Sequence, residues 1–145
     1  MPSTHFTVHT SLSPSEVLTV LTDFGPDRAK RWPNVDEQHF TVHDQGADWA
    51  DVTEGTGMGW ERERYSWDAA AGRVTIETLD SNLWAQGSGW TYDLTPARGG
   101  TDMTVTLHRV PKNLKARLVG ALIPVAGSRV LAKQFQSVLR KAEAH

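Results

Sequence analysis

The C-terminal stretch from Lys112 to Ala144 constrains the fold more than any other part of this sequence. It is the longest run of good helix-forming residues, and only Pro124 and a few glycines and serines interrupt it. Its apolar residues form two sets: Leu114, Leu118, Val119, Leu122, Ile123 and Val125, then Val130, Leu131, Phe135, Val138, Leu139 and Ala142. At about 100° per residue the two sets would point in nearly opposite directions on one straight helix. Because proline also clashes with the preceding turn, we expect the helical phase to break between Ile123 and Ser128.

The residues before this tail alternate between apolar and polar side chains, as half-buried β-strands do. The first alternating run is His5–Leu12. Ser13 and Glu16 then form a capping box around Pro14, which predicts a short helix that Gly25-Pro26 ends. Asp27–Trp32 predicts a second short helix. Six further strands follow with short turns between them: Gln38–Asp44, Asp48–Thr53, Gly59–Trp67, Arg73–Leu79, Gly87–Thr95 and Thr101–Val110.

This pattern predicts an α+β fold with the order strand, two short helices, six strands and a long helix. Short links between consecutive strands favour an antiparallel meander, so the sheet would have seven strands in all. A length of 145 residues suits one domain spanning residues 1–145, with a hydrophobic core of its own.

Composition narrows the function classes. The formal net charge of −2 argues against nucleic-acid binding, which usually needs a basic excess. The chain has no cysteine, so it can form neither a disulfide nor a thiolate metal site. No apolar run is long enough to span a membrane, and the N-terminus lacks the core of a signal peptide. We therefore expect a cytoplasmic protein without integral membrane association. The sequence leaves open whether the protein forms a homodimer.

The order of elements resembles the helix-grip fold of the superfamily that contains START domains, the major birch pollen allergen and polyketide cyclases (the SRPBCC superfamily). The segments Asp80–Trp84 and Gly87–Pro96, followed by Gly99–Thr101, are similar to actinobacterial members, as is Lys112–Lys115. The resemblance covers nearly the whole chain. It implies a curved antiparallel sheet wrapped around the long C-terminal helix, with a cavity between them. It does not imply one function, because the superfamily includes carriers, sensors, cyclases and hydrolases.

Strand alternation indicates which side chains would line such a cavity. Ile76 and Leu107 lie in apolar phases of their strands, and Trp60, Trp84, Trp90 and Tyr92 lie in neighbouring runs or at their turns. The helical tail adds Leu118 and Leu122. Large aromatic side chains with a few polar groups are the usual lining of a small-molecule pocket. The same residues would also suit a filled core without a cavity.

The run Gly59–Trp67 carries charge on both faces. Trp60, Arg62 and Arg64 share one face, and Glu61, Glu63, Tyr65 and Trp67 share the other. One hypothesis makes Arg62 or Arg64, together with Arg109, the anchor for an acidic or carbonyl group of a ligand. The alternative is cross-strand ion pairing, for example with Glu77 or Asp51. Alternation alone does not say which face of this strand points inward.

The histidines give little support to a metal site. His5 and His9, and likewise His39 and His43, share a strand face but lie about 13 Å apart along it. They also occupy phases opposite to the apolar ones. We expect no metal, no cofactor and no catalytic residue that the sequence identifies. Tyr92, Arg62 or Glu77 could polarise a substrate, but no pair of residues requires it.

The function predicted from the sequence is binding of a small, largely hydrophobic molecule, lipid- or polyketide-like, between the sheet and the C-terminal helix. The alternative is an enzyme of the polyketide cyclase or dehydratase type that uses the same cavity. A third alternative, a module that binds another protein, would show an exposed apolar patch instead of a cavity. A binding protein without enzymatic activity is favoured.

Overall fold

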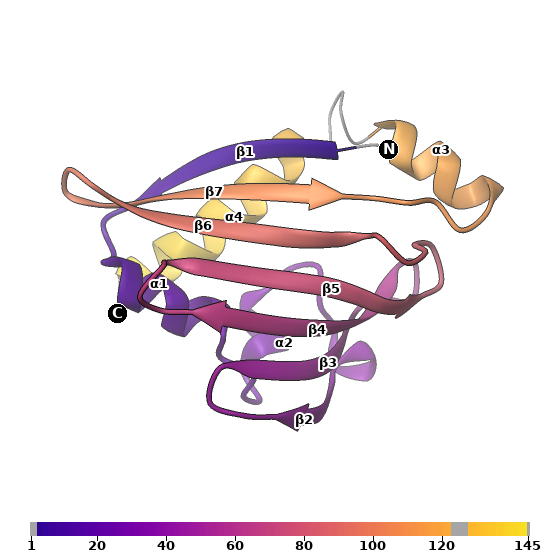
Figure 1. The fold of residues 1–145 in the computed structure, drawn as a ribbon, viewed down its shortest axis with the longest axis horizontal. Helices are drawn as coiled ribbons and strands as arrows, with labels where there is room; N and C mark the ends of the chain where they lie inside the picture. Colours follow the sequence, from indigo (N-terminus) through magenta and orange to yellow (C-terminus); the bar gives the residue numbers. More distant parts are fainter. Residues whose placement is uncertain (1–2, 123–127, 145) are drawn as a thin grey trace.

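The computed structural model describes residues 3–122 and 128–144. The chain forms β1 (Ser3–Thr10), α1 (Pro14–Leu21), α2 (Arg28–Arg31), a 3₁₀ helix η1 (Glu37–His39), β2 (Thr41–Gln45), β3 (Trp49–Gly55), β4 (Trp60–Asp68), β5 (Arg73–Ser81), β6 (Gly89–Ala97), β7 (Gly100–His108), α3 (Leu114–Leu122) and α4 (Ser128–Glu143). The strands make one seven-stranded antiparallel sheet in the order β1-β7-β6-β5-β4-β3-β2 (Figure 1). This is the predicted α+β helix-grip arrangement: the meander runs from β2 to β7, and β1 returns to pair with β7.

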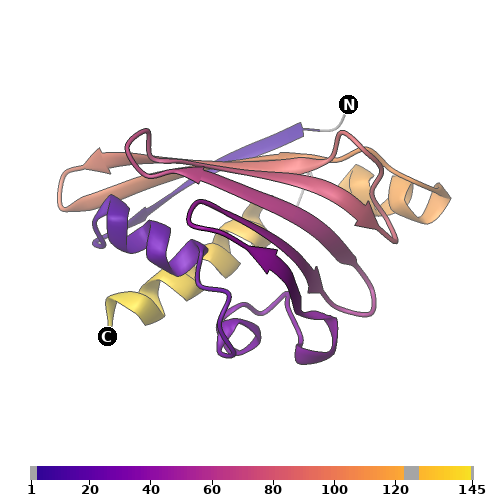
Figure 2. The ribbon, with the colours of Figure 1, turned by 60° about the horizontal axis from the view of Figure 1, so that its bottom comes forward.

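Helices α1 and α4 cover one face of the sheet (Figure 2). The start of α1 follows the predicted capping box, in which the Ser13 hydroxyl accepts from the Glu16 amide at 3.3 Å and the Glu16 carboxylate accepts from the Ser13 amide at 3.0 Å. Val17 and Leu21 of α1 are buried against the sheet. On α4 the buried residues are Phe135, Val138 and Leu139, which belong to the second apolar set of the tail.

The core lies between these helices and the inner face of the sheet. It contains the predicted apolar phases of the central and edge strands, including Val8, Val74, Ile76, Met103, Val105 and Leu107. Phe135 packs against four other aromatic rings, with centroid distances of 5.2 Å to Trp32, 5.5 Å to Tyr92, 5.8 Å to Phe6 and 6.1 Å to Trp90. One aromatic cluster thus joins α4 to β1, to β6 and to the segment after α2.

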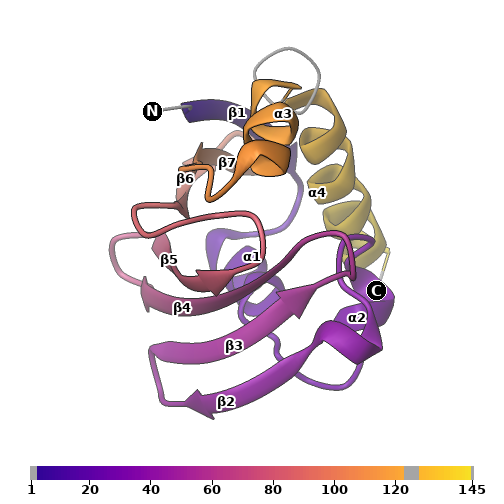
Figure 3. The same cartoon turned by 90° about the vertical axis from the view of Figure 1, so that its right-hand side faces the viewer.

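The first half of the tail behaves differently from the prediction. Helix α3 lies beyond the end of the sheet, in a different direction from α4 (Figures 1 and 3). It packs through Ala116 against Leu83 and Trp84, while Leu114 and Leu118 are 72% and 66% exposed. The expectation that Leu118 lines the cavity is therefore wrong, because α3 contacts its neighbours through a small residue. The predicted break between Ile123 and Ser128 falls outside the described residues.

All seven strands differ by a few residues from their predicted bounds, and two of these differences have a clear local reason. The first strand ends at Thr10, whose hydroxyl accepts a hydrogen bond from the Leu12 amide at 3.2 Å and so starts the turn into α1. The second strand begins at Thr41, because the Asp36 carboxylate accepts from the His39 amide at 2.9 Å and holds the preceding residues in a 3₁₀ turn. None of the helices in the described part of the chain is long and apolar enough to cross a bilayer.

Candidate functional site

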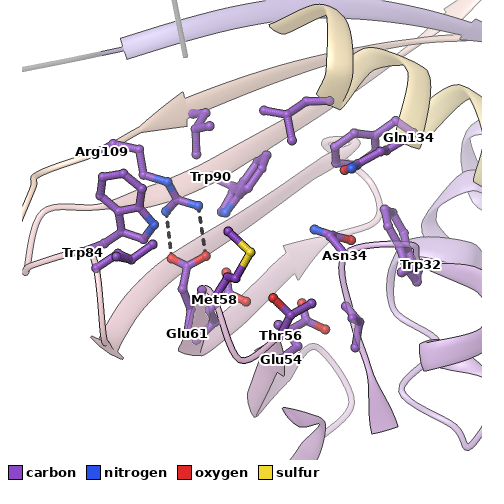
Figure 4. A pocket seen from close by; sticks show the side chains of 18 of the residues that line it. Trp32, Asn34, Glu54, Thr56, Met58, Glu61, Trp84, Trp90, Arg109 and Gln134 are labelled. Carbon is purple, nitrogen blue, oxygen red and sulfur yellow. Dashed lines mark hydrogen bonds and ion pairs between the residues drawn. The ribbon is translucent and has the colours of Figure 1, made fainter. Parts of the chain in front are cut away.

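A cavity of about 690 Å³ lies between the sheet, α4 and the segment that follows α2 (Figure 4). Its apolar wall is mainly aromatic and includes Leu21, Trp32, Trp84, Trp90, Tyr92, Leu107 and Phe135. Its polar wall consists of Arg28, Glu54, Glu61, Glu63, Tyr65 and Arg109. The cavity predicted from the helix-grip resemblance is therefore present, and a filled core is ruled out as its alternative.

One ion pair of the polar wall joins α2 to β3. Arg28 is buried, and its Nε donates to the Glu54 carboxylate at 2.6 Å. The remaining guanidinium nitrogens donate to the carbonyls of Leu21 and Asp23, at 3.1 and 2.9 Å, and to the Tyr65 hydroxyl at 3.0 Å. The Tyr65 hydroxyl in turn donates to Glu54. Every donor group of this arginine is therefore directed at the protein itself, as a buried guanidinium requires.

These contacts explain the charge states of the group. Burial raises the pKa of Glu54, but the charge and hydrogen bond of Arg28 outweigh it and the net shift is downward. Burial also acts to lower the pKa of Arg28, and Glu54 more than offsets that effect. The pKa of the Tyr65 phenol lies well above its usual range, because the ring is buried and Glu54 is close. Arg28 and Glu54 are thus a charged pair, and Tyr65 keeps its proton.

A second ion pair closes the other end of the polar wall. Arg109, just after β7, donates to both oxygens of Glu61, at 2.7 and 3.0 Å (Figure 4). The Thr78 hydroxyl adds a hydrogen bond to Glu61 at 2.9 Å. The guanidinium carbon of Arg109 lies 4.9 Å from the Trp84 ring centre and 5.1 Å from that of Trp90. A bidentate carboxylate and two aromatic rings therefore hold this arginine in place.

Glu63 lies on β4 between these two pairs and is 3% exposed. Its pKa is raised well above the usual range, first by burial and then by the nearby carboxylates of Glu61 and Glu54. A hydrogen bond with Glu54 acts in the same direction, because the protonated Glu63 is the donor. Burial and the neighbouring carboxylates thus favour the protonated form of Glu63 in the cavity wall.

The structure brings five of the predicted site residues into the cavity lining: Trp84, Trp90, Tyr92, Leu107 and Arg109. Ile76 is buried in the core opposite Trp90 but lies outside the lining. Trp60 is half-buried and also lies outside it. Leu118 is exposed on α3, where Val119 lines the cavity instead. The side chain of Leu122 lies outside what the structure describes.

The hypothesis that Arg62 or Arg64 reaches the cavity is wrong. Both side chains lie on the outer face of β4, where the Nε and a terminal nitrogen of Arg62 donate to Asp51 at 3.0 and 2.9 Å. Arg64 lies over the Trp49 ring, with its guanidinium carbon 4.6 Å from the ring centre. The structure instead shows the alternative, a cross-strand ion pair between Arg62 and Asp51.

The inner face of β4 is instead acidic, and sequence reasoning missed its partners. Glu61, Glu63 and Tyr65 were identified as one phase of the strand, but nothing local showed that this phase is buried. Arg28 was missed altogether. A lone arginine in a short helix gives no signal of burial unless the carboxylate that it reaches, here Glu54, is known.

The histidines in the described part of the chain lie outside the cavity lining. His5, His9, His43 and His108 are exposed and His39 is half-buried. His9 contacts Asp102 at 2.8 Å across β1 and β7 on the outer face, and His39 contacts Asp36 at 2.7 Å. Across residues 3–122 and 128–144 no three potential ligands are grouped in a way that could hold a metal ion.

The fold and the cavity together define a helix-grip protein with a cavity between sheet and helix, and solved structures share this fold. The protein TTHA0849 from Thermus thermophilus superposes with a TM-score of 0.80 at 14% identity, covering 99% of this chain and 98% of that one. The ZhuI aromatase/cyclase from Streptomyces sp. R1128 gives 0.79 at 16% identity, with 97% and 93% covered. A START superfamily protein from Mycobacterium smegmatis gives 0.65 at 10% identity, with 94% and 98% covered.

These similarities confirm the predicted resemblance to START-like and cyclase proteins at the level of the fold. No protein-family model matches the sequence. No curated protein matches it either. At such low identities the shared architecture does not carry the neighbours' activities over to this chain.

Proposed function

We propose that this protein binds a small, largely apolar molecule in the cavity between the sheet and α4. The observation that carries the proposal is the cavity itself. Protein interiors are close-packed and leave few voids larger than a water molecule, whereas this one measures about 690 Å³. Ligand pockets typically fall between about 300 and 1,000 Å³ and combine an apolar lining with a few polar groups. The aromatic wall formed by Trp32, Trp90 and Phe135 supports the same proposal.

The polar wall supports a ligand that is mostly, but not wholly, apolar. The two buried arginines are bound by carboxylates of the protein, so they stabilise the wall and are not open anchors. Asn34, from the segment after α2, and Gln134, from α4, add amide groups to the lining (Figure 4). A ligand would gain affinity from contact with the rings and orientation from these few polar groups.

A fluorescence titration with an environment-sensitive apolar dye tests the proposal. We expect saturable binding, with a change in tryptophan emission. Trp90→Ala should weaken the affinity by about tenfold or more, since it removes one large contact of the wall. Trp49→Ala is the matched control, because Trp49 lies on the outer face under Arg64. Equal losses in the two variants, or no saturation at all, would contradict the proposal.

A second candidate function is a proton-transferring enzyme of the cyclase or dehydratase type that uses the same cavity. It is favoured by one observation: Glu63 and Tyr92 line the cavity and both hold their protons, since burial raises the pKa of each. Protonated groups in a desolvated wall are suited to general acid catalysis. Turnover of a polyketone substrate that is lost in both Glu63→Gln and Tyr92→Phe, with dye binding retained, would favour this candidate over binding alone.

A further inference from the structure

The polar wall of the cavity contains one carboxyl group more than its arginines can pair with. Arg28 binds Glu54 and Arg109 binds Glu61, at 2.6 and 2.7 Å. Glu63, which lies between them in the lining, has no ion pair within the described residues. Either a proton or a cationic group of a ligand must therefore balance the third carboxyl.

The surroundings of Glu63 favour the proton. An unpaired carboxylate in a desolvated site is costly, and the group normally becomes neutral instead. Register places Glu54 and Glu61 directly opposite each other on β3 and β4, with Glu63 two residues further along β4. Titratable and charged groups reach this region from every neighbouring element: Glu61 and Tyr65 from β4, Glu54 from β3, Tyr92 from β6, Arg109 after β7, Arg28 from α2 and Lys115 from α3.

We propose that the Glu54–Glu63 carboxyl pair is the polar subsite of the cavity. With one proton between its two carboxyl groups, the pair takes an uncharged oxygen group of the ligand, either a hydroxyl or a carbonyl, and excludes carboxylates. The inference rests on the proposed function and specifies its ligand class. Glu63 can turn its proton from Glu54, which Arg28 and Tyr65 still bind, to a ligand oxygen, and its other oxygen can accept a hydrogen bond. Tyr92 also lines the cavity and is buried beside these carboxyl groups.

Exclusion of carboxylates follows from the two ion pairs. An entering carboxylate would find both guanidiniums already bound, Arg109 by two oxygens of Glu61 and Arg28 by Glu54 and two backbone carbonyls. To reach either arginine it would have to leave a buried glutamate without its partner. Lys115 is the remaining cation of the lining, and it is exposed on α3.

A matched series of naphthalenes tests the ligand class. Unsubstituted naphthalene, 2-naphthol, 2-acetylnaphthalene, 2-naphthoate and 2-naphthylmethylamine would be titrated by calorimetry at neutral pH. We expect the naphthol and the ketone to bind up to about tenfold more tightly than naphthalene, the gain of one hydrogen bond made in the cavity. The naphthoate should bind more weakly than naphthalene. If the amine bound most tightly of the series, Glu63 would be ionised and the proposal would be overturned. The proposal would also be overturned if naphthoate bound to the protein and Lys115→Met abolished that binding.

Variants of Glu63 test the assignment to this residue. Glu63→Leu should abolish the advantage of the naphthol and the ketone over naphthalene. Glu63→Gln should reduce it less, because the amide still donates a hydrogen bond. Glu77→Gln is the matched control, since Glu77 is exposed on the outer face of the adjacent strand. An advantage that survives Glu63→Leu would overturn the proposal.

Infrared spectroscopy tests the protonation of Glu63 without a ligand, so its result does not depend on how tightly a variant binds. The protein at neutral pH should show the carbonyl stretch of a protonated carboxyl, absent in Glu63→Gln and unchanged in Glu77→Gln. Absence of that band from the unaltered protein would overturn the proposal. Failure of the proposed function looks different: naphthalene itself would then not bind, whereas failure of this inference leaves naphthalene binding intact and removes only the preference for oxygen groups.

Discussion

Glu54 and Glu61 are directly opposite each other on β3 and β4, and each is bound by a different arginine. Like charges at facing positions of two strands destabilise a sheet. Here the two arginines come from outside the strand pair, Arg28 from α2 and Arg109 from the segment after β7. The acidic wall of the cavity therefore depends on segments far apart in the sequence, and its stability can be tested by removing either cation.

We expect Arg109→Met to lower the free energy of unfolding by about 3–5 kcal/mol, because it leaves Glu61, whose side chain is 13% exposed, without a counter-charge. Urea denaturation measures this loss. Arg62→Met is the matched control on the outer face, where its half-exposed pair with Asp51 should contribute about 0–1 kcal/mol. Equal losses would mean that the inner pair is as well solvated as the outer one.

The combination of Arg109→Met with Glu61→Leu should recover much of the stability lost in Arg109→Met alone. Replacing a whole buried pair by apolar side chains is often neutral or stabilising, whereas removing one partner is not. A double-mutant cycle by urea denaturation measures the coupling. If the double variant is as unstable as the sum of the single changes, Glu61 and Arg109 act independently.

Arg62→Met and Arg64→Met should leave the affinity for acidic ligands unchanged. Both side chains lie on the outer face, where Arg62 binds Asp51 and Arg64 lies over Trp49. Calorimetric titration of each variant with 2-naphthoate and with naphthalene measures the effect. Loss of naphthoate binding in either variant would require a second site on the outer face.

The stability of the protein should fall as the pH rises through the folded-state pKa of Glu63. This pKa is raised above its ordinary value, so the protonated group stabilises the fold fully below the unfolded value of about 4.5 and loses that contribution at higher pH. Glu63→Gln removes the titration. The difference in unfolding free energy between the variant and the unaltered protein should therefore shift in favour of the variant as pH increases. Parallel stability curves from about pH 5 to about pH 9 would contradict this expectation.

Gly72→Ala should destabilise the turn between β4 and β5 by about 1–3 kcal/mol. Gly72 has a φ of 65°, and a Cβ atom there would lie 2.5 Å from the Leu94 carbonyl oxygen. Gly99→Ala is the control, because Gly99 has a similar φ of 78° but open space around it. Thermal denaturation of both variants separates the backbone effect from the clash, and a smaller loss at Gly72 than at Gly99 would contradict the steric reason.

The sequence by itself determined the elements and most of the core. Strict alternation placed Val74, Ile76 and Leu107 on the buried face, because successive side chains of a strand point to alternate faces of the sheet. The start of α1 was equally local, because a capping box needs only residues three apart. The order of β2 to β7 in the sheet followed from the short turns, whereas the pairing of β1 with β7 did not. The resemblance to helix-grip proteins supplied the position of the C-terminal helix.

Only the tertiary structure decided which face of β4 is buried. Both faces carry charge, and a charged face can be buried only where counter-charges arrive from elsewhere. Arg28 and Arg109 provide them for Glu54 and Glu61, and the contacts are 26 and 48 residues apart in the chain. The same holds for α3, whose leucines stay exposed because the helix docks through Ala116. Local pattern specifies the direction of a side chain within its element, but burial depends on what the rest of the chain places against it.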